Sequence, residues 1–359
     1  MHSYLTAGMT FGRLTRLLAR NKVSWDPVTV IRLLFLFQSS VWSSIFAAVE
    51  HSRYGNRFAS SQTPEDPVFI IGHWRTGTTL LFQLMSLDEQ FTSPTMFQAA
   101  EPDSMLTSHA YYAPVMKFLM KGTRPMDNVK IGMDEPQEDE YAFFRLTGQS
   151  PLEQLVFPDN TTYFLQKWTE GAESSESEEL LKIQIKTFFA KVLFQKKGIL
   201  LAKNPFHSFR IRLLLDIFPK ARFIRIHRHP FSVVPSTMNL WNIMQRDNTL
   251  NRMVHKHTVG EICRGMNCMS ESIAAATTGL PPGSYAQLRF EELEKDPVTS
   301  LRELYAALGL SFPEDMPVKI NEFMAQNHDF KKNRFEISAD DKILIKSELN
   351  DYMKKYAYL

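Results

Sequence analysis

The sequence predicts an α/β protein in which a central parallel sheet is flanked by helices and preceded by a helical N-terminal extension. Two observations support this fold class. Short apolar runs alternate with helical segments between residues 198 and 308, which is the order that builds parallel sheets. Another apolar run, residues 67–71, leads through a glycine-framed loop into the apolar, helix-like residues 80–85, as in a phosphate-binding strand–loop–helix unit.

The N-terminal part, residues 1–66, is expected to form a helical extension that packs on a single globular domain of residues 67–359. Residues 33–49 carry no charge, but four serines and a glutamine interrupt them. They are therefore expected to be too short and too polar for a membrane span, which needs about 20 mostly apolar residues. Residues 11–20 form a basic amphipathic stretch, which either contacts an anionic membrane surface or packs against the core.

The domain begins with a strand over residues 67–72, and a mixed region then leads to an acidic patch at residues 133–140. Residues 171–178 are expected to form an exposed loop that ends in a helix start, where serines can cap and glutamates suit the first turn. The remaining expected elements are helix 180–197, strand 198–203, helix 209–218, strand 221–227, helix 230–240, strand 285–290 and helix 298–308, which Gly309 terminates.

The composition is that of an ordinary globular protein. Of the 359 residues, 44% are apolar and 22% are charged, and the net charge is +2. No basic stripe or tail stands out, so nothing indicates a nucleic-acid partner. The two cysteines, Cys263 and Cys268, have no second pair with which to form a zinc site. This cysteine usage favours a reducing compartment, and we expect a cytoplasmic protein, with peripheral contact at the inner membrane face left open.

The loop that follows the first strand, Gly72–Thr79, carries the strongest signal. The spacing from Gly72 to Gly77 matches a nucleotide-binding P-loop, which makes the expected fold a P-loop-like three-layer sandwich. However, Thr78 stands where such a loop has the lysine that reaches the β- and γ-phosphates. The side-chain cation here is Arg75, inside the loop. The loop therefore predicts a phosphate site without a γ-phosphoryl group, which argues against an ordinary ATPase or kinase.

Two further units follow strand ends. Arg228 comes just after the strand at residues 221–227, and Ser236 lies eight positions on, inside the next helix. Both could reach one phosphate, although a helix-capping arginine and an incidental serine would give the same pattern. Lys203 and His207 lie at the carboxyl end of another strand, where ligands of open α/β sheets bind. His207 is alternatively a helix-start histidine bonded to backbone.

These segments resemble the sulfotransferases that use 3′-phosphoadenosine 5′-phosphosulfate (PAPS), and the resemblance extends in outline over residues 67–335. It implies that the Gly72–Thr79 loop binds the 5′-phosphosulfate and that Arg228 and Ser236 bind the 3′-phosphate. Residues 201–207 are also typical of bacterial members, and Phe290 occupies an aromatic position that lies near the adenine in relatives. The donor-binding residues implied by the resemblance are Trp74, Arg75, Thr76, Gly77, Thr78, Thr79, Arg228, Ser236, Phe290 and, with Lys331 and Lys332, Arg334.

The resemblance also implies the chemistry. Sulfuryl transfer is an in-line displacement at sulfur that needs no bridging metal ion, and charge develops on the bridging oxygen of the leaving phosphate. Loop amides, Arg75 and Lys203 would stabilise that charge. The base that takes the acceptor's proton is either Glu138 or His207, with His109 as a third candidate. His255-Lys256-His257 is interpreted as an exposed helix face and not a metal site, because no third ligand is spaced to join it.

The donor motifs do not identify the acceptor. Clusters of Met, Phe and Tyr in residues 96–165 would line an apolar acceptor pocket, unless they are simply core. We therefore expect a hydrophobic alcohol, such as a sterol, a lipid or a polyketide-like metabolite. The alternatives are a carbohydrate or lipopolysaccharide acceptor, a kinase-like phosphotransferase, and a noncatalytic protein that keeps the fold. The clusters are Met105-Leu106, Tyr111-Tyr112, Met116-Lys117-Phe118-Leu119-Met120 and Phe143-Phe144.

Overall fold

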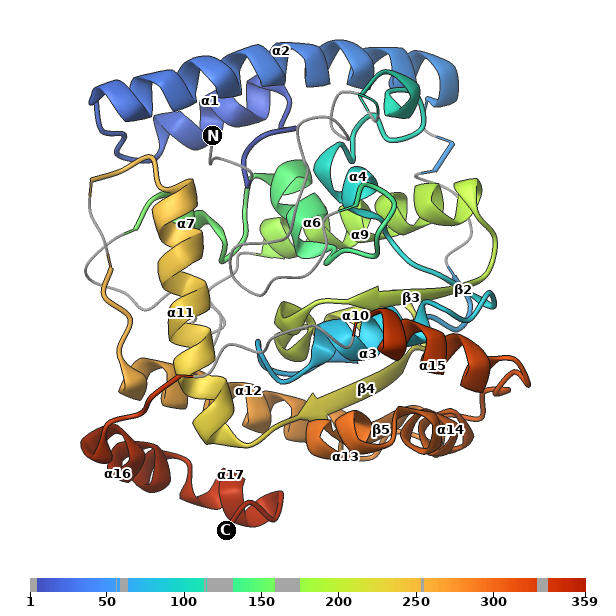
Figure 1. The fold of residues 1–359 in the computed structure, drawn as a ribbon. Helices are drawn as coiled ribbons and strands as arrows, with labels where there is room; N and C mark the ends of the chain where they lie inside the picture. The colour runs from blue at the N-terminus through green and yellow to red at the C-terminus, as the bar shows by residue number, and fades with distance from the viewer. Residues whose placement is uncertain are drawn as a thin grey trace.

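A five-stranded, wholly parallel sheet forms the centre of the computed structural model (Figure 1). The structure describes residues 5–55, 57–58, 64–112, 114, 132–158, 175–252, 255–327 and 335–359. The strand order is β2-β3-β1-β4-β5, so the first strand lies in the middle of the sheet. The strands are β1 (Val68–Ile71), β2 (Phe91–Thr92), β3 (Ile199–Lys203), β4 (Arg222–His227) and β5 (Tyr285–Arg289).

Helices cover both faces of the sheet, which confirms the predicted fold class. The alternation of side chains along β1 shows the two layers: Phe69 and Ile71 join a core with α6, α9, α11 and α12, whereas Val68 and Ile70 join one with α3, α14 and α15. The described helices are α1 (Phe11–Ala19), α2 (Pro27–Tyr54), α3 (Thr78–Met85), α4 (Met96–Ala100), α6 (Glu140–Thr147), α7 (Glu153–Val156), α9 (Ser175–Gln195), η1 (Pro205–Phe209), α10 (Ile211–Ile217), α11 (Pro230–Asn248), α12 (Val259–Thr277), α13 (Phe290–Lys295), α14 (Pro297–Ala307), α15 (Met316–Gln326), α16 (Ala339–Glu348) and α17 (Asn350–Lys355).

The four long predicted strands are confirmed, and β2 is the strand that the sequence did not reveal. β2 has two residues, which is too short for a recognisable apolar pattern. The helix expected over residues 209–218 is present as α10, which begins at Ile211. The short 3₁₀ helix η1 precedes it, and the Asn204 side chain caps η1 by accepting a hydrogen bond from Phe206 N. The helix expected to end at Leu240 continues to Asn248, with Pro235 inside it.

The N-terminal extension consists mainly of α2, a 28-residue helix whose first turn is capped by the Asp26 carboxylate. Residues 33–49 were expected to be too short to span a membrane. That expectation is wrong about length, because these residues form only part of a longer helix. By length and apolar composition α2 could cross a bilayer. Of the apolar 18-residue stretch within it, 22% is buried in the protein. Leu14 of α1 and Leu36 of α2 join the same core as β1, and the domain boundary at residue 66 remains a prediction.

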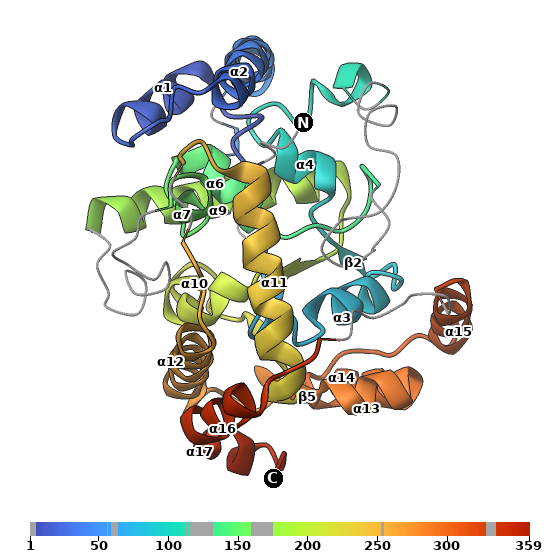
Figure 2. The ribbon, with the colours of Figure 1, turned by 60° about the vertical axis from the view of Figure 1, so that its left-hand side comes forward.

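Helix α2 lies at one end of the molecule in both views, and α16 and α17 lie at the other end (Figures 1 and 2). The sheet and the carboxyl ends of its strands lie between them.

Candidate active site

The loop between β1 and α3 has a backbone that only certain residues can adopt. Gly72 and Gly77 have φ of 133° and 100°, and Arg75 has φ of 68°, which is rare for a residue with a side chain. A Cβ atom on Gly72 would lie 2.5 Å from Ile226 O, and one on Gly77 would lie 2.1 Å from Phe290 Cδ2. The two glycines are therefore required because β4 and a ring on α13 approach the loop closely.

The inside of the loop is held by its own polar groups. Thr76 Oγ1 donates to His73 O at 2.7 Å, and the amide of Gly72 donates to Ser208 Oγ at 3.0 Å. His73 is buried, which lowers its pKa to about 4, so the ring is neutral and bonds through Nδ1 to Trp74 O at 3.0 Å. Gly77, the N-cap of α3, offers no side-chain cap to the first amides of the helix, which leaves them suited to an anion.

Trp74 lies in the core instead of on the surface of the loop. Its side chain is 5% exposed and packs edge-on against Phe206 and Trp241, with ring centroids 4.7 and 4.9 Å away. A nucleotide base stacks on an open ring face, so this placement argues against a direct contact between Trp74 and the base of the donor.

Arg75 of the loop meets two predicted phosphate ligands from a distant segment, Arg228 and Ser236, and we call these three residues the cationic cluster. Arg75 Nε donates to Ser236 Oγ at 2.8 Å, and Arg228 Nη1 donates to Arg75 O at 3.4 Å. Burial lowers the pKa of the Arg228 guanidinium, which remains charged at neutral pH. Two positive charges and a hydroxyl held this close form a strong anion-binding arrangement.

Phe290 connects this cluster to the loop. Its ring lies 4.1 Å from the guanidinium carbon of Arg228 on one side and contacts Gly77 on the other. The cation–π contact orients the arginine toward the site. The sequence resemblance predicted that Phe290 lies at the donor site, and its ring here also lies against the phosphate loop and against Arg228 in the turn between β4 and α11.

A second part of the site lies at the carboxyl end of β3. Lys203 Nζ forms an ion pair with Glu138 Oε1 and lies 3.5 Å from Thr79 Oγ1 at the start of α3. The Lys203 side chain is almost fully buried, whereas that of Glu138 retains some exposure. The structure therefore brings a predicted leaving-group cation, a predicted base and a loop threonine into contact.

The two acidic residues after Glu138 have structural partners. Asp139 Oδ1 accepts a hydrogen bond from Asn204 Nδ2 at 2.7 Å, and Glu140 is paired with Arg210 through both carboxylate oxygens. Burial would raise the pKa of Glu140, but Arg210 and the hydrogen bonds from Asn204 and Ser150 lower it below its usual value. Three consecutive carboxylates thus pair with side chains of residues 203–210, and this network fixes Glu138 in the site.

His207 belongs to that network, and its position argues against the expected role as base. Its Nε2 lies 3.0 Å from Asp139 Oδ2, both side chains are completely buried, and Phe69 packs edge-on at 5.3 Å. A base must reach the acceptor hydroxyl, and a ring enclosed between β1 and α6 cannot do so. The sequence placed His207 at the right strand end, but it could not show that the side chain turns inward.

The remaining base and acceptor candidates have varied positions. His109 is exposed, and its Nε2 lies 3.6 Å from Asp134 Oδ1. Met105, Phe143 and Phe144 are core residues, which is the alternative that the sequence left open for these clusters. Other predicted residues lie outside the described part of the chain: the acceptor cluster Met116–Met120 and the cations Lys331, Lys332 and Arg334.

The interpretation of His255-Lys256-His257 is corrected in three respects. The segment precedes α12 without being helical, and His257 is buried instead of exposed. A third potential ligand does exist, because Glu261 lies on the first turn of α12 and its Oε1 is 3.1 Å from His255 Nε2. Glu261 also accepts a hydrogen bond from Thr258 N, so its carboxylate already caps the N-terminus of α12.

The C-terminal segment contributes to the site in a way that the sequence did not predict. Tyr358 Oη lies 2.9 Å from His227 Nδ1 and donates to Glu291 Oε2 at 3.1 Å. Glu291 Oε1 in turn accepts from the amide of His229, next to Arg228. These bonds hold the turn between β4 and α11 in place. The feature of the sequence that could have indicated this contact is the pair of aromatic residues near the C-terminus, Tyr356 and Tyr358.

Comparison with known proteins agrees with this geometry. The model of the "Sulfotransferase family" matches residues 67–314. The omega-hydroxy-beta-dihydromenaquinone-9 sulfotransferase Stf3 of Mycobacterium bovis is 29% identical over 361 residues, which cover 99% of this chain and 91% of that protein. Human carbohydrate sulfotransferase 5 is 31% identical over 281 residues, which cover 71% of this chain and 64% of that protein.

Solved structures show the same fold. Sulfotransferase STF9 from Mycobacterium avium superposes with a TM-score of 0.70 at 16% identity, covering 97% of this chain and 96% of that one. Sulfotransferase STF1 from Mycobacterium tuberculosis gives 0.65 at 14% identity, with coverages of 95% and 91%. The family match rules out the kinase-like alternative. This chain, with its modified phosphate loop and its cationic cluster, is a member of the sulfotransferase family.

Proposed function

We propose that the protein transfers a sulfuryl group from PAPS to a hydroxyl group of a hydrophobic acceptor. One observation carries the proposal most directly: Arg75, Arg228 and Ser236 converge beside the phosphate loop although they lie on different elements. A nucleotide that bears phosphate groups at both ends of its ribose would use the loop and this cluster together.

The chain's own residues account for donor binding. The first amides of α3 and the loop backbone would bind the 5′-phosphosulfate, and the cationic cluster would bind the 3′-phosphate. The hydrogen bond from Arg75 Nε to Ser236 Oγ supports this arrangement, because it would hold the guanidinium between the two phosphate positions. Phe290 would position the adenosine by holding Arg228 and the loop together.

The transfer step would use Lys203 and Glu138. The acceptor oxygen bonds to sulfur as the bond between sulfur and the bridging oxygen breaks, and 3′-phosphoadenosine 5′-phosphate (PAP) leaves. Lys203 would stabilise the charge on the bridging oxygen, and Glu138 would take the acceptor's proton. Their ion pair supports this assignment, because a lysine drawn toward the donor phosphate would free Glu138 to act as a base. No metal ion takes part in this scheme.

A hydrophobic acceptor is supported by the Mycobacterium bovis relative, whose name describes a lipid-quinone alcohol as its substrate. Sterol, lipid and polyketide-like alcohols fall in the same class. A carbohydrate acceptor is the second candidate, since a human relative is named a carbohydrate sulfotransferase. We further propose a cytoplasmic enzyme that is peripheral at the inner membrane face, with two free cysteines that suit a reducing compartment.

Two assays test the proposal. PAP should raise the thermal midpoint in EDTA, whereas ATP with magnesium should not, because a ligand that binds only the folded state stabilises it. Radiolabelled sulfate should then move from PAPS to a hydroxylated isoprenoid quinone in EDTA and not to N-acetylglucosamine. Stabilisation by ATP with magnesium alone would contradict the donor assignment. Transfer to the sugar alone would retain the donor site and replace the acceptor class.

A further inference from the structure

The long N-terminal helix α2 has its apolar side facing outward. Large apolar side chains recur every three or four positions along one exposed face, in the pattern of a single helical stripe. Trp25, just before the helix, is 81% exposed. The exposed stripe, as we call it, consists of Val28, Val30, Ile31, Leu34, Phe35, Val41, Trp42, Ile45 and Val49.

The opposite face of α2 combines Leu33 and Leu36 with buried polar groups and is tied to the body of the protein. Ser43 Oγ donates to Glu101 Oε2 at 3.1 Å, and Ser40 and Ser43 are buried. Glu50 is also buried, where it pairs with Lys191 at 2.7 Å and accepts from the amide of Leu106 at 2.8 Å. A helix that spanned a bilayer would lose these partners, and buried polar groups without partners are costly. The packing therefore favours a helix that stays on the protein with its stripe facing outward.

The charges near the stripe have one predominant sign. Residues 1–58 hold seven Lys or Arg and two Asp or Glu, whereas residues 59–359 hold 34 and 37. Of the two acidic residues, Asp26 caps the helix and Glu50 is buried. The basic residues Lys22 and Arg53 are exposed near opposite ends of the stripe. An apolar stripe with basic residues at its ends complements an anionic lipid surface.

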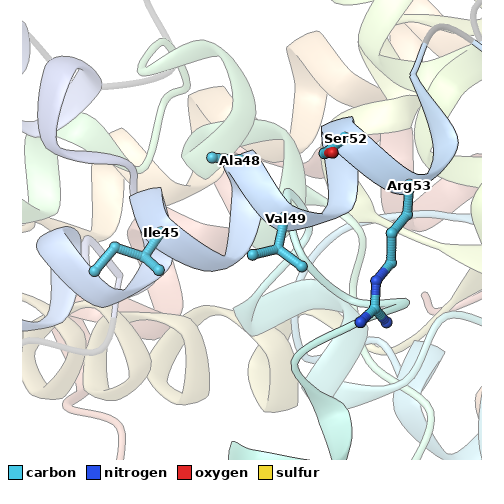
Figure 3. Close-up of a pocket in the computed structure, with 5 residues that line it drawn as sticks. All are labelled: Ile45, Ala48, Val49, Ser52 and Arg53. Atoms are coloured by element: carbon cyan, nitrogen blue, oxygen red, sulfur yellow. The ribbon is translucent and has the colours of Figure 1, made fainter.

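A shallow pocket on α2 adds a place for an apolar chain. It is lined by Ile45, Ala48, Val49, Ser52 and Arg53 at the C-terminal half of the helix (Figure 3). Four small or apolar residues and one cation match the chemistry of an acyl chain beside an anionic head group.

We propose that the exposed stripe of α2 docks the enzyme on an anionic lipid bilayer, with the helix lying in the plane of the interface. The stripe from Val28 to Val49 is about 32 Å long at 1.5 Å per residue, and no charged residue occurs between Arg32 and Glu50. Exposed Trp25 and Trp42 are of the residue type that settles at membrane interfaces. This docking rests on the proposed hydrophobic acceptor, because it would hold the active site beside a membrane-dissolved alcohol.

The test uses the full chain and vesicles of phosphatidylcholine with or without 30% phosphatidylglycerol. The purified protein should sediment with the anionic vesicles and should show blue-shifted tryptophan emission. The double variant Ile31→Glu/Ile45→Glu should bind these vesicles at least tenfold more weakly. Ile343→Glu on α16 is the matched control, since Ile343 is 68% exposed and Ile31 is 67% exposed. That control should bind like the wild type.

Three results would overturn the docking proposal. The first is equal vesicle binding by the double variant and the wild type. The second is a dimer in light scattering that Ile31→Glu/Ile45→Glu dissociates while no vesicle binding occurs, which would assign the stripe to a second copy. The third is resistance to alkaline carbonate extraction from cell membranes, which would indicate a spanning helix. Thermal stabilisation of every variant by PAP shows separately whether the donor site is intact.

Discussion

Replacing Gly77 with alanine tests how closely the phosphate loop and Phe290 are packed. The new Cβ would lie 2.1 Å from Phe290 Cδ2, far inside van der Waals contact, and the backbone has φ of 100°. The left-handed conformation alone costs a residue with a side chain about 1–2 kcal/mol. Overpacking in a tight site costs about 1–3 kcal/mol more. Gly77→Ala should therefore destabilise the protein by about 2–5 kcal/mol.

Gly279→Ala separates the two contributions. Gly279 has φ of 82°, but a Cβ atom there meets nothing within 4 Å, so only the backbone term applies. Its expected cost is about 1–2 kcal/mol. Adding Phe290→Ala to each variant completes a double-mutant cycle, in which the steric term should vanish for Gly77→Ala only.

The measurement is the free energy of unfolding in urea, followed by PAP titration of the folded variants. Gly77→Ala should also weaken PAP binding, because displacing the Phe290 ring moves Arg228, which lies 4.1 Å from it. If Gly77→Ala costs no more than Gly279→Ala, the Phe290 ring does not limit the loop, and the packing argument fails.

Further predictions concern catalysis, donor binding and pH. Glu138→Gln should lower kcat by about 10²–10⁴-fold with PAP stabilisation retained, whereas His207→Gln should lower the thermal midpoint and leave kcat per folded molecule unchanged; the reverse pattern would make His207 the base. Arg228→Ala should weaken PAP binding by about ten- to a hundredfold, measured by calorimetry, while Lys342→Ala on α16 should not. Burial lowers the pKa of His73 to about 4. Below about pH 6.5, the unfolded chain therefore binds a proton at His73 and the folded protein does not. His73 should thus remove about 2 kcal/mol of stability between pH 7.5 and pH 5, and His73→Gln should abolish that part of the pH dependence in urea titrations.

Features set by neighbouring residues could be predicted from the sequence. The strand–loop–helix unit around Gly72 and Gly77 is local, because the glycines, the apolar strand and the helix start act within about 20 positions of one another. The cationic cluster was also predictable in outline, since Arg228 and Ser236 follow a strand end and parallel strands present these ends at one edge of the sheet.

Features that depend on distant partners could not be predicted. Glu138, Asp139 and Glu140 look alike in the sequence, and only their contacts with residues 203–210 distinguish a base candidate from two structural residues. The burial of His207 follows from the same contacts. Likewise, the apolar composition of α2 was evident, but the side of the helix that faces the protein depends on Glu101 and Lys191.

The run of three acidic residues also constrains how the enzyme can change over evolutionary time. Each residue depends on its place in the run, because the first pairs with Lys203, the second with Asn204 and His207, and the third with Arg210. Inserting or deleting one residue within the run would misalign these pairs and should destabilise the domain. Substituting Glu138 alone would leave the two structural pairs in place. If Glu138 is the base, as proposed, a folded but inactive descendant could arise by a single substitution, whereas a length change in this stretch would disturb all three pairs.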